Sequence, residues 1–527
     1  MPRSTARLLV ELLESYGVSH VFGIPGVHNL ELYRALAGSK LTHVLPRHEQ
    51  AAGFMADGFA RASGRPAACF AITGPGLANL ATALGTAHAD SVPMLVFATV
   101  LESRDRGLGR GRLHEIRDQR SVVASMSGLC DTALVPEAVV ELLARAFARF
   151  AVERPRPAVI ELPIDLLAAE TATEATAIPP PRPPAPVPQA VEEVARMLGA
   201  AERPALLLGG GALCGGARWR GFVERWGLPA VTTVAAKGLL PEDHPLTLGA
   251  TLACAATRRW LAGRDIVLVV GSELAETDFW HEPVTLGRRR IRIDLDPDRL
   301  ADSRHPAELS LRADAGTFLE ALMEREPRRR SADRDLAALR AAALAEVAPG
   351  SRRAAAIAAL RRALPQEALL FTDMTRIAYA ANALFPVEVP RRFFHATGFG
   401  TLGWALPAAI GAAFARPSVP VVALVGDYGL QFSLAELGTA VEHGLPLLVV
   451  VWNDRGLGQI REEMLGRGME PLATTLRSPD LPALAAAFGM AGRRVATARE
   501  LEAAVAVACA RRAPSLIEVC ATAFTHG

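Results

Sequence analysis

The sequence lacks the features that would place it in a membrane, in a secretory compartment or on nucleic acid. No apolar run reaches the ~18–20 residues of a membrane span. Glu11 and Glu14 interrupt an N-terminal stretch, predicted as an amphipathic helix, that could otherwise serve as a signal-peptide core. The net charge of +2 is too small to favour nucleic acid or acidic membranes. These absences predict a cytoplasmic protein with neither kind of partner.

Cysteine is scarce and irregularly spaced. The six cysteines form no CxxC pair and no metal-ligand spacing, so we expect reduced core residues rather than a disulfide framework. No short-period repeat is present, which argues against a solenoid.

What the sequence does contain is a threefold alternation of short apolar strands and Ala-rich helices. A chain of 527 residues is too long for one core and predicts about three domains. The Pro/Ala-rich stretch 171–189 is a predicted spacer, and the Arg/Ala-rich stretch 324–351 separates two further patterns. The sequence therefore predicts an α/β protein of three consecutive doubly wound parallel-sheet domains, over residues 1–170, 189–323 and 351–527.

Two carboxylates follow neighbouring predicted strands near the C-terminus. A buried strand over residues 419–425 leads into a turn that contains Asp427. A second strand over residues 447–452 is followed by Asp454. Acidic residues directly after buried strands need a chemical reason, because isolated charges are costly to bury.

A predicted helix connects these two strands. Ser433 and Glu436 form a capping-box pattern, and the helix is expected to run to His443. The resulting βαβ unit places both strand ends at one sheet edge, where open α/β sheets bind ligands. Asp427 and Asp454 can converge there on Mg²⁺, which would also hold phosphate oxygens. Two unrelated loop carboxylates remain the alternative.

The same stretch, GDYG…WNDRG, resembles the GDG…NN motif of thiamine diphosphate-dependent enzymes, the family of acetolactate synthase, pyruvate decarboxylase and benzoylformate decarboxylase. The resemblance implies that Mg²⁺ is bound by Asp427, Asp454 and the carbonyl of Gly456. Tyr428 stands where the family usually has Gly, and Gly429 can take over the close approach to the diphosphate. Asp454 replaces the usual Asn and still offers an oxygen ligand.

The resemblance extends over nearly the whole chain. VFGIPG (21–26) resembles the first loop of the pyrimidine-binding domain, TGPGLANLATAL (73–84) its glycine loop, and ATGFGTLGWALPAAIGAA (396–413) the segment that supports the bent cofactor. In that last segment, Leu402 matches the bulky apolar residue beneath the cofactor, and the carbonyl of Gly400 would accept from the 4′-amino group. The cofactor-binding residues implied by resemblance, besides the metal edge, are Pro25, Gly26, Glu49, Thr73, Asn79, Gly400, Leu402 and, in a looser match, Thr375.

Glu49 is the expected catalytic acid. PRHEQAAGFMADGFAR (46–61) matches the stretch that carries the family's catalytic glutamate, which hydrogen-bonds N1′ of the aminopyrimidine and so promotes loss of the thiazolium C2 proton. Independently, Glu49 opens an Ala/Gly-rich helix after the predicted strand 42–45. A carboxyl in such apolar surroundings can stay partly protonated and donate to a ring nitrogen. Capping the helix is the alternative role.

The middle segment makes FAD doubtful. Residues 189–320 resemble the family's middle domain, but GGGALCGG (209–216) does not have the GxGxxG spacing. Acetolactate synthases bind FAD through a Met-His-Gly turn and an Arg after the sheet. This chain has TLGATLA (247–253) and VGSELAETDFW (270–280) at those places.

Three stretches are expected to surround the substrate: GIPGVH, RGRLHEIRDQ (110–119) and IREEMLGRG (460–468). Val27 and His28 would line the pocket. His28 and His114 offer imidazoles for proton transfer, and the carboxylates for a cationic tail come from Glu115, Asp118, Glu462 and Glu463. A structural histidine and a solvated helix surface are the alternatives. Together with GSELAETDF, these stretches most resemble 5-guanidino-2-oxopentanoate decarboxylases of arginine catabolism.

The leading hypothesis is therefore a thiamine diphosphate- and Mg²⁺-dependent decarboxylase of a small-molecule 2-oxo acid with a long or cationic tail. An acetolactate-synthase-like carboligase is the second, and a non-catalytic cofactor-binding protein the third. The family's cofactor lies between subunits, which implies a homodimer or homotetramer.

Overall fold

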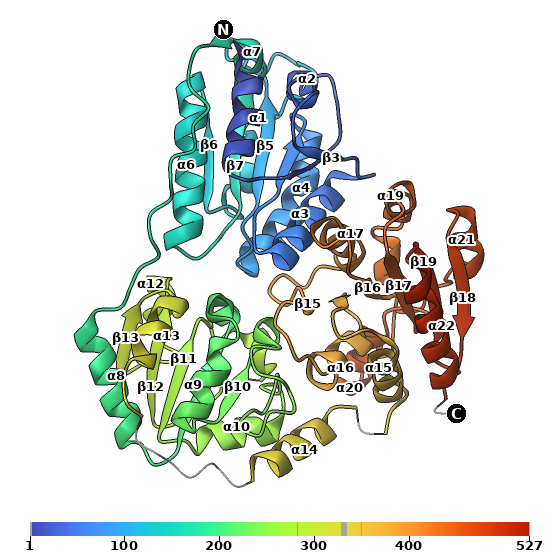
Figure 1. Cartoon of the computed structure of the whole chain (residues 1–527). Helices are drawn as coiled ribbons and strands as arrows, with labels where there is room; N and C mark the ends of the chain where they lie inside the picture. The colour runs from blue at the N-terminus through green and yellow to red at the C-terminus, as the bar shows by residue number, and fades with distance from the viewer. Residues whose placement is uncertain (1–2, 282, 328–334, 349, 526–527) are drawn as a thin grey trace.

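The computed structural model describes residues 3–281, 283–327, 335–348 and 350–525. It contains three parallel sheets flanked by helices, one after another along the chain (Figure 1). The predicted α/β class with three parallel-sheet domains is thus confirmed. Within these ranges no helix is long and apolar enough to cross a bilayer. All six cysteines are free; Cys69 and Cys254 are buried, whereas Cys214 is exposed.

The N-terminal domain is built on a six-stranded sheet whose carboxyl edge carries the first candidate loops. The spatial order is β3 (Thr42–Val44), β2 (His20–Gly23), β4 (Ala68–Ala71), β5 (Leu95–Val100), β7 (Ala158–Pro163) and β6 (Leu129–Thr132). Its helices are α1 (Thr5–Ser15), α2 (Leu30–Leu36), α3 (Glu49–Ser63), α4 (Pro75–Ala89), α5 (Gln119–Ala124), α6 (Pro136–Val152) and α7 (Ile164–Ala168). A short antiparallel pair joins β1 (Arg3–Ser4) to β8 (Glu170–Thr171).

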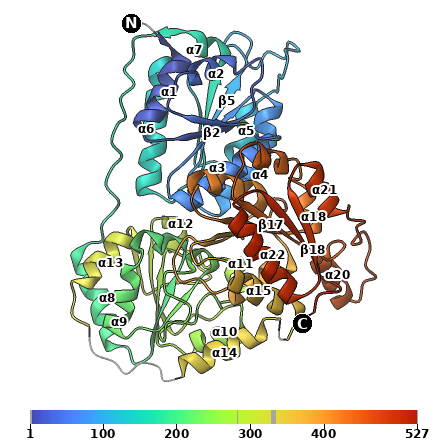
Figure 2. The same ribbon diagram turned by 45° about the vertical axis from the view of Figure 1, so that its right-hand side comes forward.

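Residues 172–187 form no helix or strand and descend as an extended trace to the middle domain (Figure 2). That domain has the strand order β10 (Ala230–Thr232), β9 (Pro204–Leu208), β11 (Ile266–Val270), β12 (Arg289–Asp294) and β13 (Leu309–Arg312). Its helical elements are α8 (Pro188–Ala200), η1 (Gly210–Gly215), α9 (Arg218–Trp226), η2 (Val234–Ala236), α10 (Ala255–Ala262), α11 (Glu276–Phe279), α12 (Pro297–Leu300) and α13 (Ala315–Met323), followed by α14 (Leu336–Glu346).

The C-terminal domain repeats the six-stranded arrangement, in the order β15 (Phe393–His395), β14 (Leu369–Thr372), β16 (Val421–Gly426), β17 (Leu447–Asn453), β19 (Ser515–Cys520) and β18 (Ala491–Val495). Its helices are α15 (Arg352–Ala363), α16 (Arg376–Leu384), α17 (Ala405–Ala415), α18 (Asp427–Gln431), α19 (Glu436–Glu442), α20 (Gly458–Gly466), α21 (Leu481–Ala487) and α22 (Ala498–Arg511). The predicted turn after β16 is therefore a short helix, α18.

The predicted capping box at the start of α19 is wrong. The residue before the helix is Ala435, and no side chain caps it. Glu436 is buried and accepts a hydrogen bond from the backbone N–H of Arg47, 2.9 Å away in the N-terminal domain. The carboxylate that the local pattern predicts as part of the cap therefore makes a contact between domains instead.

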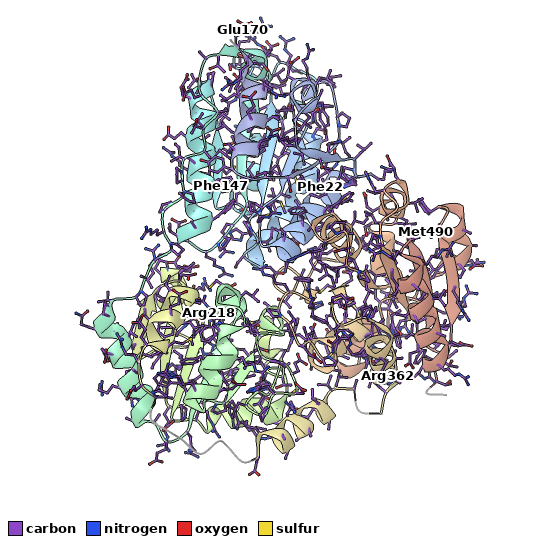
Figure 3. The ribbon with its side chains drawn as sticks, viewed as in Figure 1. Phe22, Phe147, Glu170, Arg218, Arg362 and Met490 are labelled. Carbon is purple, nitrogen blue, oxygen red and sulfur yellow. The ribbon has the colours of Figure 1, made fainter. Side chains whose placement is uncertain are left out.

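One buried apolar cluster spans the N- and C-terminal domains. It includes Phe22 beneath α3 and Met490 beside β18, both labelled in Figure 3. The middle domain, where Arg218 is labelled, has a separate cluster of its own. The opposite face of the N-terminal sheet, covered by α1 and α6, forms a third. The first and last domains therefore share a core, which brings α3 against α17.

Candidate active site

The carboxyl ends of β16 and β17 bring Asp427 and Asp454 to one edge of the C-terminal sheet. The two strands pair in parallel up to the last residue of β16. Oδ2 of Asp427 accepts hydrogen bonds from the backbone N–H of Gly456 (3.0 Å) and from the hydroxyl of Ser478 (2.8 Å). Asp427 is only 2% exposed. Burial raises the pKa of its carboxyl, and the charge of Asp454 raises it further.

This edge fits a hard cation held together with phosphate oxygens. A cation would remove the repulsion that Asp454 exerts on Asp427. In the described part of the chain, no group of three or more His, Cys, Asp or Glu side chains could hold a metal. Two carboxylates and a main-chain carbonyl leave coordination positions open, as a metal bound together with a diphosphate requires.

Glycines leave room at this edge. Gly456 has φ 139°, and a Cβ there would lie 2.1 Å from the carbonyl oxygen of Thr474. On the neighbouring strand, a Cβ at Gly426 would lie 3.2 Å from the hydroxyl of Thr375, which precedes α16. Thr375 therefore faces the metal edge, in keeping with its loose match to a diphosphate-contacting loop.

A third carboxylate at the same edge escaped the sequence analysis. Asp373 follows β14 as Asp427 follows β16, and that repeated pattern was the available signal. Its carboxylate accepts from the backbone N–H of Gly403 (2.9 Å), and burial raises its pKa to about 6. A Cβ at Gly429 would lie 2.7 Å from its Oδ2, so only glycine fits there.

Tyr428, the unusual residue of the motif, is half-buried.

Glu49 is the first residue of α3 and is half-buried. Its Oε2 accepts a hydrogen bond from the side-chain amide of Asn79, 2.9 Å away on α4. The helix cap is His48, whose Nδ1 accepts from the backbone N–H of Gln50 (3.1 Å). The alternative role of Glu49 as the cap is thereby excluded. Gly76 lies beside the carboxylate: a Cβ there would be 3.6 Å from Oε1, an ordinary contact, but only 2.7 Å from the side chain of Ile72.

A buried asparagine, also missed from sequence, shapes the GIPG loop. Asn29 accepts from the backbone N–H of Gly26 (2.7 Å) and donates to the carbonyl of Ile24 (3.1 Å). A Cβ at Gly26 would meet Ile72 at 2.2 Å, and Pro25 is exposed at the tip. The side chain of Thr73 points elsewhere: its hydroxyl lies 3.0 Å from that of Thr99.

The structure brings His28 and His114 together from loops far apart in the sequence. Their ring centroids are 5.0 Å apart, at an interplanar angle of 67°. The Nδ1 atom of each ring is buried without a hydrogen-bond partner. Burial lowers the pKa of His28, and the neighbouring His114 lowers it further. His28 is therefore neutral near pH 7. Val27 beside it is 61% exposed.

Two of the expected substrate-facing carboxylates are occupied by their own loop. Glu115 accepts hydrogen bonds from the backbone N–H groups of Arg112 (2.9 Å) and Arg110 (3.2 Å). Asp118 caps α5 and accepts from the backbone N–H of Ser121 (3.2 Å). Both therefore hold the loop in shape.

The other two lie on α20, which follows the metal edge. Glu462 forms an ion pair with Arg376, whose Nη1 also lies 3.6 Å from Oδ2 of Asp454. Glu463 accepts only from the neutral amide of Gln459 (3.2 Å) and has no cationic partner among the described residues. Of the four expected carboxylates, Glu463 is the one left available for a cation.

The cofactor-supporting loop lies between β15 and α17. Gly400 has φ 65° and is exposed, and Leu402 is half-buried. In the described part of the chain, no hydrogen bond or ion pair joins Glu49 to the Asp427 edge. The two halves of the candidate site therefore belong to separate domains.

The glycine-rich turn of the middle domain is packed against its own sheet. The backbone N–H of Gly211 donates to the carbonyl of Gly271 (3.0 Å). A Cβ at Gly209 would lie 2.2 Å from that same oxygen. The turn is therefore packed tightly against the residues that follow β11, and its spacing still differs from GxGxxG.

Comparison with known proteins identifies the chain. Family models for the N-terminal, central and C-terminal domains of thiamine pyrophosphate enzymes match residues 3–122, 191–322 and 373–519. A probable 2-ketoarginine decarboxylase of Pseudomonas aeruginosa is 46% identical over 98% of this chain and 94% of its own length. The large subunit of acetolactate synthase isozyme 1 of Escherichia coli is 30% identical over 87% of this chain and 83% of its own. A probable acetolactate synthase large subunit of Methanocaldococcus jannaschii is 29% identical, over 98% and 91%. The chain belongs to the thiamine pyrophosphate enzymes, and thiamine diphosphate is its cofactor.

Proposed function

We propose that this enzyme decarboxylates 5-guanidino-2-oxopentanoate without oxidation, with CO₂ and an aldehyde as products. The observation that carries the proposal is the 46% identity, over almost the full length of both chains, to a probable 2-ketoarginine decarboxylase. 2-Ketoarginine is another name for 5-guanidino-2-oxopentanoate. The acetolactate synthases are more distant relatives, at about 30% identity. The expected cytoplasmic location stays a prediction.

The metal edge and Glu49 have separate tasks in this proposal. Asp427, Asp454 and the carbonyl of Gly456 would hold Mg²⁺ and, through it, the diphosphate. When bound, thiamine diphosphate supplies a nucleophilic carbon and an electron sink. Glu49 is held by Asn79 through Oε2, which leaves Oε1 able to share a proton with a ring nitrogen.

The two histidines can move the proton that aldehyde formation needs. The carbon that loses CO₂ must gain a proton, and an imidazole within reach of it can act as general acid and base. The rings of His28 and His114 are in contact, and the Nδ1 atom of each is buried without a hydrogen-bond partner. Each would therefore hold or pass a proton at Nδ1.

Glu463 is the proposed partner of the guanidinium tail. Guanidinium groups bind carboxylates through two parallel hydrogen bonds, and removing one side of such a pair is costly once water is excluded. Glu463 lies on α20 beyond the metal edge and accepts from a neutral amide only. A neutral substrate such as pyruvate would leave this carboxylate unpaired.

A second copy of the chain is proposed to complete the site. Apolar side chains are exposed around both halves: Val27 (61%) and Leu113 (60%) on the N-terminal domain, and Phe432 (53%) and Leu472 (78%) on the C-terminal domain. Exposed apolar groups that border polar sites mark interaction surfaces. A homodimer or homotetramer would cover them and bring the Glu49 half of one chain to the Asp427 half of another.

Steady-state kinetics with 5-guanidino-2-oxopentanoate, pyruvate and benzoylformate test the function. We expect the highest kcat/KM for the guanidino acid. Glu463→Gln should lower that value on the order of tenfold, about 1.4 kcal/mol, and leave turnover of benzoylformate unchanged. Glu470→Gln, at an exposed glutamate just beyond α20, is the matched control and should change neither.

The two alternatives predict different products. Acetolactate accumulating from pyruvate would favour the carboligase, which the synthase relatives support. Binding of thiamine diphosphate without CO₂ release from any of the three acids would favour a non-catalytic protein.

A further inference from the structure

Both ends of the cofactor-supporting loop, residues 399–403, are bonded to the N-terminal domain of the same chain. At one end the backbone N–H of Gly398 donates to Oδ1 of Asp90 (2.8 Å). At the other end the indole N–H of Trp404 donates to Oδ1 of Asp57 (3.0 Å). The loop is thus held at two points by carboxylates of another domain.

A single arginine joins these two carboxylates. Arg61 donates to Asp57 (Nε to Oδ1, 2.6 Å) and to Asp90 (Nη2 to Oδ2, 2.8 Å). Its guanidinium also lies over the ring of Trp404, 5.0 Å from the centroid. Asp57 is fully buried, and the side chains of Arg61 and Asp90 are 12% and 8% exposed. We call Asp57, Arg61 and Asp90 the buried triad.

α3, which carries Asp57 and Arg61, and α17, which follows the loop, are packed backbone to backbone. Added to Gly58 of α3, a Cβ would lie 1.9 Å from the carbonyl oxygen of Ala408 on α17. A Cβ added to Gly411 of α17 would lie 1.8 Å from the carbonyl oxygen of Met55 on α3. The two helices therefore cross in direct backbone contact, side by side in Figures 1 and 2.

Stability alone does not account for a buried triad of charges. The desolvation cost of buried ion pairs often cancels their attraction, and well-packed apolar residues can be equally stable. What charged, directional bonds provide is a fixed geometry. The same helix begins with Glu49, about 18 Å from Arg61 at 1.5 Å per residue. One rigid element thus carries a catalytic acid at its start and fixes the cofactor loop near its end.

We infer that Asp57, Arg61 and Asp90 are positioning residues that set the place of Gly400 and Leu402 under the cofactor. The inference rests on the proposed cofactor contacts of those two residues. It assigns the N-terminal domain a second task beside supplying Glu49: it orients, within its own chain, the loop on which the cofactor would rest.

Asp90→Ala and Trp404→Phe test the inference at the two ends of the loop. Each removes one anchoring bond, and Trp404→Phe keeps most of the ring and is the milder change. A misplacement of about 1 Å can cost on the order of a hundredfold in rate. At saturating cofactor and substrate, we expect kcat to fall at least tenfold in Asp90→Ala and several-fold in Trp404→Phe, with KM for the oxo acid little changed. Asp90→Asn keeps an acceptor for Gly398 and should recover part of the loss.

The control is a buried ion pair elsewhere. Lys237 and Glu242 of the middle domain form one, with side chains 0% and 12% exposed. Glu242→Gln should lower Tm, as Asp90→Ala does, but leave kcat per bound cofactor unchanged. If Asp90→Ala and Trp404→Phe lower Tm with kcat intact, the triad is merely structural and the inference is wrong. Leu402→Ala separates this outcome from a failure of the proposed cofactor placement, because normal kcat in Leu402→Ala would contradict the placement itself.

Discussion

Replacing Asp278 with asparagine probes the electrostatics between the middle and N-terminal domains. Burial raises the pKa of Asp278 from 3.8 to about 7; hydrogen bonds from Ala275 and Ser272 oppose the rise, and the charge of Asp90 adds to it. The unfolded chain releases this proton near pH 4, whereas the folded protein keeps it until about pH 7. The contribution of Asp278 to folding stability is therefore present below about pH 4 and is lost as the pH rises through that window.

The size of the effect follows from the same values. One pKa unit is worth about 1.4 kcal/mol, so a shift from 3.8 to about 7 corresponds to at most about 4 kcal/mol. Asp278 is only half-buried, and solvent screens part of this, so we expect about 1–3 kcal/mol. Asparagine does not titrate. Asp278→Asn should be more stable than the wild type by that amount at pH 8, and by less than half of it at pH 5.

Urea unfolding followed by tryptophan fluorescence measures this difference. Four of the six tryptophans lie in the middle domain, so the signal reports mainly on the domain that carries Asp278. The urea concentrations at the unfolding midpoint are compared only where the dependence of the free energy on urea is equal, because a chain of three domains need not unfold in one step. Asp298→Asn, at an exposed position of the same domain, should follow the wild-type pH profile. An advantage of Asp278→Asn that is equal at pH 5 and pH 8 would refute the reasoning.

Four further substitutions test the site and the domain contact. Asp427→Ala should abolish Mg²⁺-dependent binding of thiamine diphosphate, whereas Asp454→Asn should retain it because the amide oxygen is still a ligand; unchanged affinity of Asp427→Ala by calorimetry would disprove the metal assignment. Glu49→Gln should bind cofactor normally but lose about 10²–10⁴ in rate, the usual value of a general acid or base; near-normal turnover would exclude the assigned role. Gly58→Ala should lower Tm by several degrees, because its Cβ would lie 1.9 Å from the backbone of α17; an unchanged Tm would mean that α3 and α17 are not in the contact described.

Much of the C-terminal site could be predicted from sequence because it depends on one short stretch of the chain. The strands before Asp427 and Asp454 are continuous apolar runs, and a single crossover between parallel strands puts their ends at one edge. The parallel pairing of β16 with β17 bears out that geometry. Asp373 could have been found by the same pattern after β14, the strand beside β16 in the sheet.

What sequence could not provide is the partner of each polar group. Glu115 looked like a substrate ligand, but its loop folds back so that backbone amides reach the carboxylate; Gly109 and Gly111, with positive φ, allow this. Glu436 matched the pattern of a helix cap, yet its carboxylate accepts a hydrogen bond from the backbone of Arg47, almost four hundred residues away. The contact of His28 with His114 likewise depends on two loops that meet only in the folded domain. Long-range contacts of this kind leave no periodic signal in the chain.

The core shared by the first and last domains has a consequence for how the chain is made. The face of the N-terminal sheet under α1 and α6 closes on itself, so it can be completed soon after synthesis. The other face is completed by side chains from Leu369 onward, some two hundred residues later. At roughly 5–20 residues per second, these emerge from the ribosome roughly 10–40 s afterwards. For that interval, during which the middle domain is made, the nascent N-terminal domain keeps exposed the apolar face of α3 that later packs against α17. That face is where a chaperone would bind the growing chain.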